Sequence, residues 1–300
     1  MNTASSIVTT MAFVLLLLPS VSIGSAVRSA IRSGNFSDPT IWSPIGVPAT
    51  GDLVSIASGS DVVLNQNSTI QNLSVQDNGR LRVTANNLLT INGTISVMGR
   101  LDINEGNINL TQSGTSFVVG PHGTVLWAPA DNTIQGATLF TNGIENFDPT
   151  STLIIYNWYN YTNTPLGSVV TGSFGNLVLS TLWNGMLFEW DQKNQFQSHP
   201  ILGKLTIDQG WVVLDKTGQI TNTTIGSIEL ANSNSYLDFH SGTHNGTIVV
   251  NTSSIINNGG TLNGVVNGNA NVTLNVSGDF SNSGSDRKST RLNSSHVALS

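Results

Sequence analysis

The residues of this 300-residue chain that come nearest to a metal site are Asp238 and His240, followed by His244. Side chains two positions apart in a strand point to the same side, so Asp238 and His240 could face one ligand. A metal site in a protein uses three or four protein ligands, and the sequence supplies no evident third partner for this pair. We therefore expect no metal site and interpret these three residues as polar turn residues on the surface.

Acid–base catalysis on a polysaccharide requires carboxylates that converge, or a basic side chain beside them. The acidic residues are instead scattered along the chain, as Asp208, Asp215 and Asp238 illustrate, and their separations single out no pair. No serine lies in a nucleophile motif with a histidine partner. We expect no catalytic residue and no cofactor. The alternative is a fragment of a carbohydrate-active enzyme, a polysaccharide lyase or hydrolase, whose catalytic coils lie partly beyond Ser285.

Aromatic side chains are the best candidates for ligand contact, because aromatic faces suit sugar rings. The competing interpretation is that these rings pack over the flank of the fold, where their burial is favourable by about 25 cal/mol per Å². The candidate ligand-binding residues are Tyr156, Trp158, Tyr159, Tyr161, Trp183 and Trp190.

The elements that must position these residues follow a recurring pattern, which is a glycine, one variable residue, and a short strand of alternating apolar residues. The pattern begins at Gly79, Gly99 and Gly123, and again at Gly175, Gly203, Gly226 and Gly246, in short and uneven steps. A unit this short cannot bury its own apolar row and must stack on its neighbours. The spacing predicts a right-handed parallel β-helix (a β-solenoid) with little α-helix. Turn sequences such as Asp77-Asn78-Gly79 also suit hairpins, so the alternative is a β-sandwich.

The chain divides into five parts. Residues 1–26 are typical of a secretory signal peptide, because the apolar run from Met11 to Leu18 is too short to span a bilayer and Pro19 follows it. We expect a first solenoid half over 27–130, an aromatic bridging segment over 131–171, and a second half over 172–285. No later segment reaches the roughly 18 apolar residues of a membrane helix. The sequence therefore predicts a secreted or cell-surface protein.

The fifth part, residues 286–300, differs from the rest of the chain. Asp286–His296 can be back-translated into consecutive codons of a common sequencing-library adapter, and three of the eleven basic residues of the chain lie in this tail. We interpret the tail as non-native and without regular structure, and we expect the natural chain to continue beyond Ser285.

Composition narrows the classes of partner. Between residues 27 and 285 the chain has 8 Lys and Arg against 16 Asp and Glu, a formal charge of −8. A chain this acidic is a poor ligand for phosphate backbones, so we expect no nucleic-acid partner. It has no cysteine, and its stability must come from hydrogen-bond ladders and stacked apolar rows instead of disulfides.

The opening of the chain after the signal carries a resemblance. Gly34-Asn35-Phe36-Ser37-Asp38-Pro39-Thr40-Ile41-Trp42, then Gly46-Val47-Pro48 and Gly51-Asp52, resembles the start of β-helix modules in bacterial surface proteins. It is also similar to the eight-glycine domain of animal ectodomain proteins. The segments Phe147–Tyr156 and Phe174–Leu177 resemble a repeat of the same bacterial proteins. The resemblance implies a secreted or surface-attached β-helix that takes part in adhesion or glycan contact, and it assigns no active site.

Two residues of this opening have physical roles of their own. We expect Trp42 to cap the open end of the first coil, with ligand contact as the alternative, and Asp52 to accept hydrogen bonds from turn N–H groups. The sequence as a whole predicts an exported structural or adhesive protein. Its expected partner is an extracellular glycan or a cell-surface or matrix component that lies along one face of the solenoid.

Overall fold

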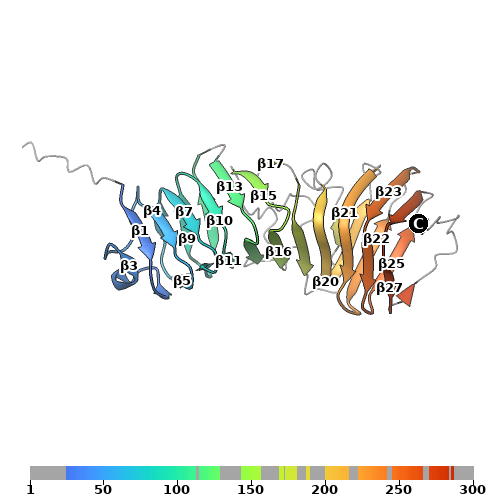
Figure 1. Cartoon of the computed structure of the whole chain (residues 1–300), viewed down its shortest axis with the longest axis horizontal. Coiled ribbons are helices and arrows are strands. Elements are labelled where there is room, and N and C mark those ends of the chain that lie inside the picture. Colours follow the sequence, from blue (N-terminus) through green and yellow to red (C-terminus); the bar gives the residue numbers. More distant parts are fainter. Residues whose placement is uncertain are drawn as a thin grey trace, which may run out of the picture.

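The computed structural model describes residues 25–112, 115–128, 143–156, 169–171, 173–180, 187–189, 200–215, 222–241, 245–265, 270–283 and 285–286. Over these ranges the chain is nearly all β-structure, and its one helix is the short 3₁₀ turn η1 (Pro39–Ile41). Strands of successive coils lie side by side along an elongated body (Figure 1). Every described strand pairing except that of β1 with β3 is parallel. The predicted parallel β-helix is thus confirmed, and the β-sandwich alternative is wrong.

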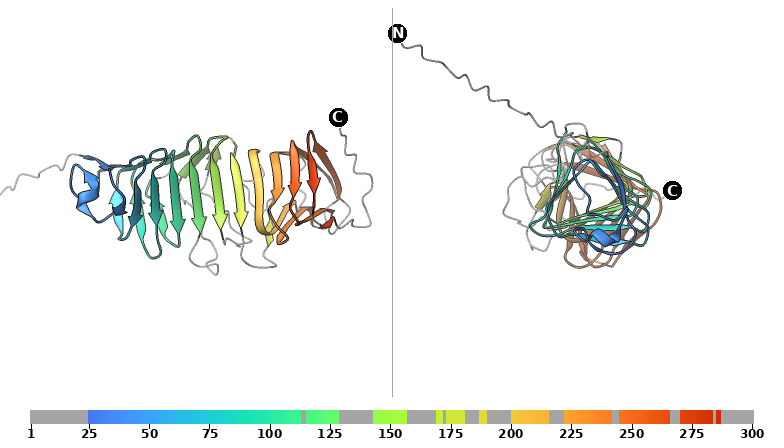
Figure 2. Two further views of the ribbon diagram at one scale, coloured as in Figure 1. Left: turned by 60° about the horizontal axis from the view of Figure 1, so that its bottom comes forward. Right: turned by 90° about the vertical axis from the view of Figure 1, so that its left-hand side faces the viewer.

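The coils follow one another along a single axis, and in the view along that axis they overlie one another in a common outline (Figure 2). Each coil contributes strands to sheets that run the length of the body. Sheet A has eight strands, in the order β17 (Val169–Thr171), β15 (Gly143–Phe147), β13 (Thr115–Val119), β10 (Ile95–Val97), β7 (Asn72–Val75), β4 (Leu53–Ile56), β1 (Val27–Ala30) and β3 (Trp42–Ser43).

Sheet B is the longest and passes through every part of the described solenoid. Its strands are β2 (Gly34–Asn35), β5 (Asp61–Leu64), β8 (Arg80–Val83), β11 (Arg100–Asn104), β14 (Thr124–Ala128), β16 (Thr152–Tyr156), β18 (Asn176–Ser180), β20 (Ile201–Asp215), β21 (Asn222–Leu230), β24 (Ser254–Asn257) and β27 (Phe280–Asn282).

Three smaller sheets complete the coils. Sheet C, near the N-terminal end, consists of β6 (Ser68–Ile70), β9 (Leu88–Ile91) and β12 (Asn107–Leu110). In the C-terminal coils, sheet D consists of β19 (Leu187–Glu189), part of β20, β22 (Ser235–His240), β25 (Thr261–Val265) and β28 (Ser285–Asp286). Sheet E consists of part of β21, β23 (Thr247–Thr252) and β26 (Asn271–Val276).

The core is the interior of the solenoid, and alternation along each strand fills it. In β4 and β7 every second residue is buried, which is the period-2 pattern of a strand with one face inward. The inward positions of neighbouring coils lie opposite one another, as in the row Val54, Leu73, Ile95 and Phe117 of sheet A. Each coil therefore completes the apolar row of the next, as the repeat pattern requires.

The repeated glycines stand where the chain turns into sheet B. A β-carbon at Gly99 would come well inside 3.0 Å of the carbonyl oxygens of Gln76 and Gly79, in the preceding coil. The carbonyl of Gly79 accepts a hydrogen bond from Arg100 N at 2.9 Å, and that of Gly99 accepts one from Thr124 N at 2.8 Å. This close contact between coil backbones explains the glycine at position 99, although Ser151 occupies the equivalent corner of a later coil.

One glycine of the predicted series, Gly246, does not lie at the corner that leads into sheet B. Gly246 precedes β23 of sheet E, whereas Gly226 lies in β21 at the start of its sheet B segment. The position stacked on Gly226 is Ser253, whose backbone N–H donates to the Gly226 carbonyl at 2.7 Å. The sequence separation between Gly226 and Gly246 is therefore not the number of residues in one coil.

The N-terminal end of the solenoid is closed by Trp42. Its side chain is fully buried, its Nε1 donates to the Phe36 carbonyl at 3.0 Å, and its ring meets the Phe36 ring edge-on at 5.0 Å. Strand β3, which begins with Trp42, runs antiparallel to β1 and so covers the first parallel edge. The predicted cap is confirmed, and ligand contact by Trp42 is wrong.

Asp52 joins the first strand to the turns around it. One carboxylate oxygen accepts from Ala26 N at 3.1 Å, and the other accepts from Ala49 N at 2.9 Å and from Arg28 Nε at 2.7 Å. Burial of the carboxyl opposes ionisation, but the hydrogen bonds from Ala49, Arg28 and Ala26 outweigh it and lower the pKa of Asp52 below 3.8. The predicted bonding of Asp52 to turn N–H groups is confirmed.

The predictions for the two ends of the chain and for its internal boundaries have different outcomes. Asp286 pairs with Leu262 in the β28–β25 ladder, so the expectation of no regular structure in the tail is wrong at its first residue. Residues 287–300, and 1–24 of the expected signal peptide, lie outside the described residues. The division at 130 and 171 stays a prediction, and sheet B continues through all three ranges. Within the described part of the chain, no helix has the length and apolar character needed to cross a membrane.

The glycine corner yields a stability prediction. We expect Gly99→Ala to destabilise the protein by about 3 kcal/mol, the upper part of the range for overpacking, because its new methyl group meets backbone and not a movable side chain. Gly59→Ala is the matched control, because a β-carbon there has no atom within 4 Å and only the positive φ of 77° opposes it, at about 1–2 kcal/mol. Urea unfolding of both variants measures the difference, and equal costs would contradict the steric explanation.

The Asp52 contacts predict an acid-labile N-terminal end. A folded-state pKa below the unfolded value stabilises the fold above about pH 4, and this stabilisation is lost as the pH falls through the folded pKa. We expect Asp52→Asn to lose about 1–3 kcal/mol at pH 7, because it replaces an acceptor oxygen with a donor. The difference between wild type and variant should shrink below pH 4 in urea unfolding, and a difference independent of pH would contradict this account.

Candidate functional site

The structure describes only one of the predicted aromatic ligand residues. Tyr156 is the last residue of β16, lies opposite Ser180 of β18, and is half-buried. The other five lie outside the described residues: Trp158, Tyr159, Tyr161, Trp183 and Trp190. An aromatic binding patch built from these residues stays a prediction.

The interpretation of Asp238 and His240 as surface turn residues is wrong. Both lie in strand β22 and are fully buried, although they occupy the positions that alternate with the inward-facing Leu237 and Phe239. Among the residues that the structure describes, no group of three or more His, Cys, Asp or Glu side chains could hold a metal ion. His244, the third residue considered, lies outside the described ranges.

Asp238 and His240 each have a partner from a neighbouring coil. Asp238 accepts hydrogen bonds from Trp211 Nε1 at 2.6 Å and from Asn263 Nδ2 at 2.7 Å. His240 Nδ1 lies 3.0 Å from Oδ2 of Asp215, which is also fully buried. The register of sheet D produces the pairs, because β20, β22 and β25 run parallel and place Asp215 opposite His240.

The same register creates an aromatic surface that the sequence analysis missed. Trp211 lies directly opposite Tyr236 in the neighbouring coil, and Tyr236 keeps 39% of its surface exposed. We call these two residues the aromatic ledge. The separation of Trp211 and Tyr236 in the sequence falls in the range of coil lengths and could have indicated the pair. Neither residue has a second exposed aromatic residue beside it in its own strand that would have drawn attention to it.

Asp238 holds the Trp211 side of the ledge. Burial raises the pKa of Asp238 above 3.8, although the hydrogen bonds from Asn263 and Trp211 act in the opposite direction. If the Trp211 indole turned away, the buried Asp238 carboxyl would lose a hydrogen-bond donor, which costs about 1–3 kcal/mol. The bond to Asp238 therefore strongly favours one orientation of the indole. The indole of Trp211 is thus positioned before any ligand arrives, which reduces the ordering cost of binding.

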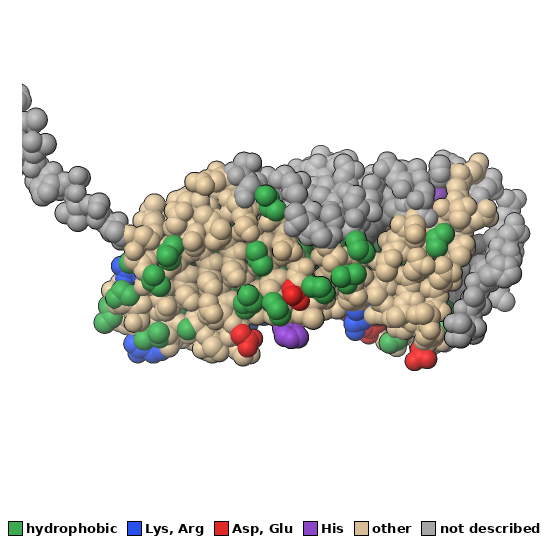
Figure 3. Space-filling model, turned by 45° about the horizontal axis from the view of Figure 1, so that its top comes forward, with side chains coloured by type: hydrophobic (Ala, Val, Ile, Leu, Met, Phe, Trp, Pro, Cys, Tyr) green, Lys and Arg blue, Asp and Glu red, His purple; other side chains and the backbone are tan. Residues whose placement is uncertain are grey.

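A second cluster of charges lies on sheet B and has a structural role. Asp102 is buried and accepts from Arg80 and from Arg100 Nε at 2.7 Å, while Asp61 accepts from Arg82 Nε at 2.9 Å. These residues lie on β5, β8 and β11, so the ion pairs join three successive coils. On the face shown in Figure 3, charged side chains are sparse.

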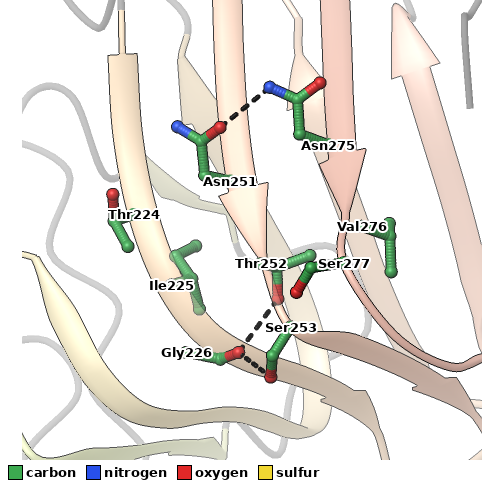
Figure 4. Close-up of a pocket in the computed structure, with 9 residues that line it drawn as sticks. All are labelled: Thr224, Ile225, Gly226, Asn251, Thr252, Ser253, Asn275, Val276 and Ser277. Atoms are coloured by element: carbon green, nitrogen blue, oxygen red, sulfur yellow. Dashed lines mark hydrogen bonds between the residues drawn. The ribbon is translucent and has the colours of Figure 1, made fainter. Parts of the chain in front are cut away.

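A groove of about 520 Å³ lies where the chain passes from sheet E into sheet B, and we call it the corner groove (Figure 4). Three successive coils each contribute three consecutive residues to it. The lining residues are Thr224, Ile225, Gly226, Asn251, Thr252, Ser253, Asn275, Val276 and Ser277.

Comparison with known proteins places part of the chain near one family. Residues 47–140, under a third of the chain, match the TamB C-terminal domain, which belongs to a family related to outer-membrane assembly. The match begins just before β4 and extends past β14, so it covers coils of sheets A, B and C. Neither the curated proteins nor the solved structures give a significant match. The likeness to the family indicates an association with the cell envelope or surface.

The raised pKa of Asp238 predicts how stability depends on pH. A carboxyl whose folded pKa exceeds the unfolded value gives its full stabilisation below about pH 4, and this is lost as the pH rises through the folded pKa. We therefore expect the stability of the wild type relative to Asp238→Asn to fall as the pH rises from 4 towards neutrality. Urea unfolding of both proteins across this range measures the trend, with Glu229→Gln, a half-exposed ion-pair partner, as the control. A rising or flat difference would contradict the assignment.

Proposed function

We propose that this chain is an exported protein of the cell envelope or surface that contacts glycans through the outer face of its solenoid, without catalysing a reaction on them. The observation that carries the proposal is the aromatic ledge. Trp211 and Tyr236 lie side by side on an outer sheet face, and a buried carboxylate holds the indole. Aromatic faces offer the C–H surface of a sugar ring an apolar contact, while the edges stay available for hydrogen bonds.

The envelope location is supported by the likeness of residues 47–140 to the TamB C-terminal domain. The composition supports the choice of ligand, because only 9% of residues are charged and the formal net charge is −6. A surface of this kind disfavours polyanions and suits ligands that bind through hydroxyl groups and apolar faces.

The alternative, a carbohydrate-active enzyme on a β-helix, requires acidic, basic or His side chains that converge in a groove. The described part of the chain has two groups of such side chains. The Arg and Asp residues of sheet B bond to one another, and the Asp215–His240 pair is fully buried beside Asp238. A fully buried pair does not reach a substrate in this conformation. No observation on the described residues therefore favours the enzyme over the binding protein.

The proposal predicts the behaviour of the ledge in a binding assay. We expect a glycan-array screen of the full chain to give binding that Tyr236→Ala weakens about tenfold, equivalent to ~1.4 kcal/mol of lost contact. Ile256→Ala is the matched control, because Ile256 has the same exposed fraction of 39% but lies on sheet B. Trp158→Ala tests the aromatic residue predicted from the sequence alone.

Equal losses in Tyr236→Ala and Ile256→Ala would indicate general surface adhesion and contradict a role for the ledge. Absence of binding to every glycan on the array would remove the proposal. Loss of binding in Trp158→Ala alone would move the site to the aromatic segment.

A further inference from the structure

The corner groove is built from equivalent positions of three coils. Thr224 of β21 lies opposite Asn251 of β23, which lies opposite Asn275 of β26. Thr252 and Val276 are opposite one another in the next row. Since neighbouring strands are about 4.8 Å apart, equivalent positions recur at that interval along the solenoid axis. The coils of β23 and β26 each present an asparagine and a serine there, whereas the coil of β21 presents Thr224 and Gly226.

The groove has two polar rows with backbone between them. Side chains alternate along a strand, so the buried positions Thr252 and Val276 turn their side chains inward and leave their backbone as the floor. The row on one side carries the amides of Asn251 and Asn275. The row on the other side carries the hydroxyls of Ser253 and Ser277. None of the nine lining residues is charged.

The amide row is held in one orientation. Asn275 Nδ2 donates to Asn251 Oδ1 at 2.8 Å, and Asn251 Nδ2 donates to Asn222 Oδ1 at 2.9 Å, as the dashed line between the first two shows (Figure 4). A side-chain amide has two N–H donors and an acceptor with two lone pairs, so Asn275 keeps further capacity after this bond. Asn275 and Ser277 are both exposed and therefore accessible to a ligand in the groove.

We propose that the corner groove binds a linear, neutral, β-1,4-linked glycan that lies along the solenoid axis, with about one sugar for each coil. The rise of such a chain per sugar is close to the spacing of the coils. Alternate sugars are turned over by half a turn, so the two edges of successive rings meet the two polar rows in alternation. Its equatorial hydroxyls reach both polar rows while its flat ring face lies over the floor. The proposal deepens the proposed glycan function, but it rests on a different corner of the solenoid from the aromatic ledge.

Other ligands fit the groove less well for physical reasons. An extended peptide repeats every ~3.3 Å and falls out of step with coils spaced at about 4.8 Å. An acyl chain would cover the remaining hydrogen-bonding groups of Asn275 and Ser277 without bonding them, at about 1–3 kcal/mol for each group left unsatisfied. A chain of uronic acids would meet no cation among the lining residues, on a protein whose formal net charge is −6.

The test measures binding of the full chain to hydroxyethyl cellulose, a soluble neutral β-1,4-glucan, by affinity electrophoresis. Polygalacturonate serves as the charged comparison and laminarin, a β-1,3-glucan, as the comparison for linkage. The variants are Asn275→Ala and Ser277→Ala. Asn271→Ala is the matched control, because Asn271 is an exposed asparagine on the same strand outside the groove lining. Circular dichroism and thermal midpoints check that each variant folds.

We expect Asn275→Ala and Ser277→Ala each to weaken glucan binding about three- to tenfold, the cost of one hydrogen bond, and the double variant more than tenfold. Asn271→Ala and Tyr236→Ala should leave binding to this probe unchanged. Equal binding of all variants, tighter binding of polygalacturonate or laminarin, or no binding of the glucan would each overturn the groove proposal. Glycan binding that depends on Tyr236 but not on Asn275 would overturn the groove and retain the proposed function.

Discussion

The backbone contact between successive coils at the entrance to sheet B constrains everything else in the solenoid. At this corner the carbonyl of one coil accepts the N–H of the next, as Gly79 does from Arg100 and Gly99 does from Thr124. The approach is so close that a β-carbon at Gly99 would collide with carbonyl oxygens of the preceding coil. Once this corner is fixed, the strands that leave it must run parallel and in register. The inward apolar rows and the outward polar rows then follow from alternation along each strand.

The solenoid also absorbs variation in coil length. Arg80, Arg100, Thr124 and Thr152 lie opposite one another in sheet B, although their positions in the sequence advance by a larger step at each successive coil. The extra residues are accommodated between strands and not within the ladder. A solenoid of this kind can therefore acquire surface features on one coil without disturbing its neighbours, which is the usual advantage of repeat architectures.

Polar side chains on the outer faces of the three sheets differ in their hydrogen-bond partners and in their exposure to solvent. On sheet B the Arg and Asp residues of three coils bond to one another, and on sheet D the buried Asp238 holds Trp211. On sheet E the asparagine row is ordered but still exposed. The family likeness covers residues 47–140, whereas the aromatic ledge and the corner groove are built from coils after residue 200. The likeness and the proposed binding surfaces thus concern different parts of the same stack.

The sequence by itself determined the class of fold, because the recurring glycine and the alternating apolar residues are local consequences of stacking. It also predicted the Trp42 cap and the turn bonds of Asp52, whose partners lie close in sequence or at the end of the first coil. It could not assign Gly246 to sheet E, because a glycine before a strand does not reveal which sheet the strand joins.

Only the tertiary structure decided which distant residues meet. Asp215 and His240, and Trp211 and Tyr236, have the same separation in the sequence, and they lie opposite one another because that particular coil has that length. Since coil lengths vary along the chain, no fixed period identifies such pairs in advance. The burial of Asp238 and His240 was unforeseeable for the same reason: alternation places both on the outer side of the strand, and only neighbouring coils supply the partners that make their burial tolerable.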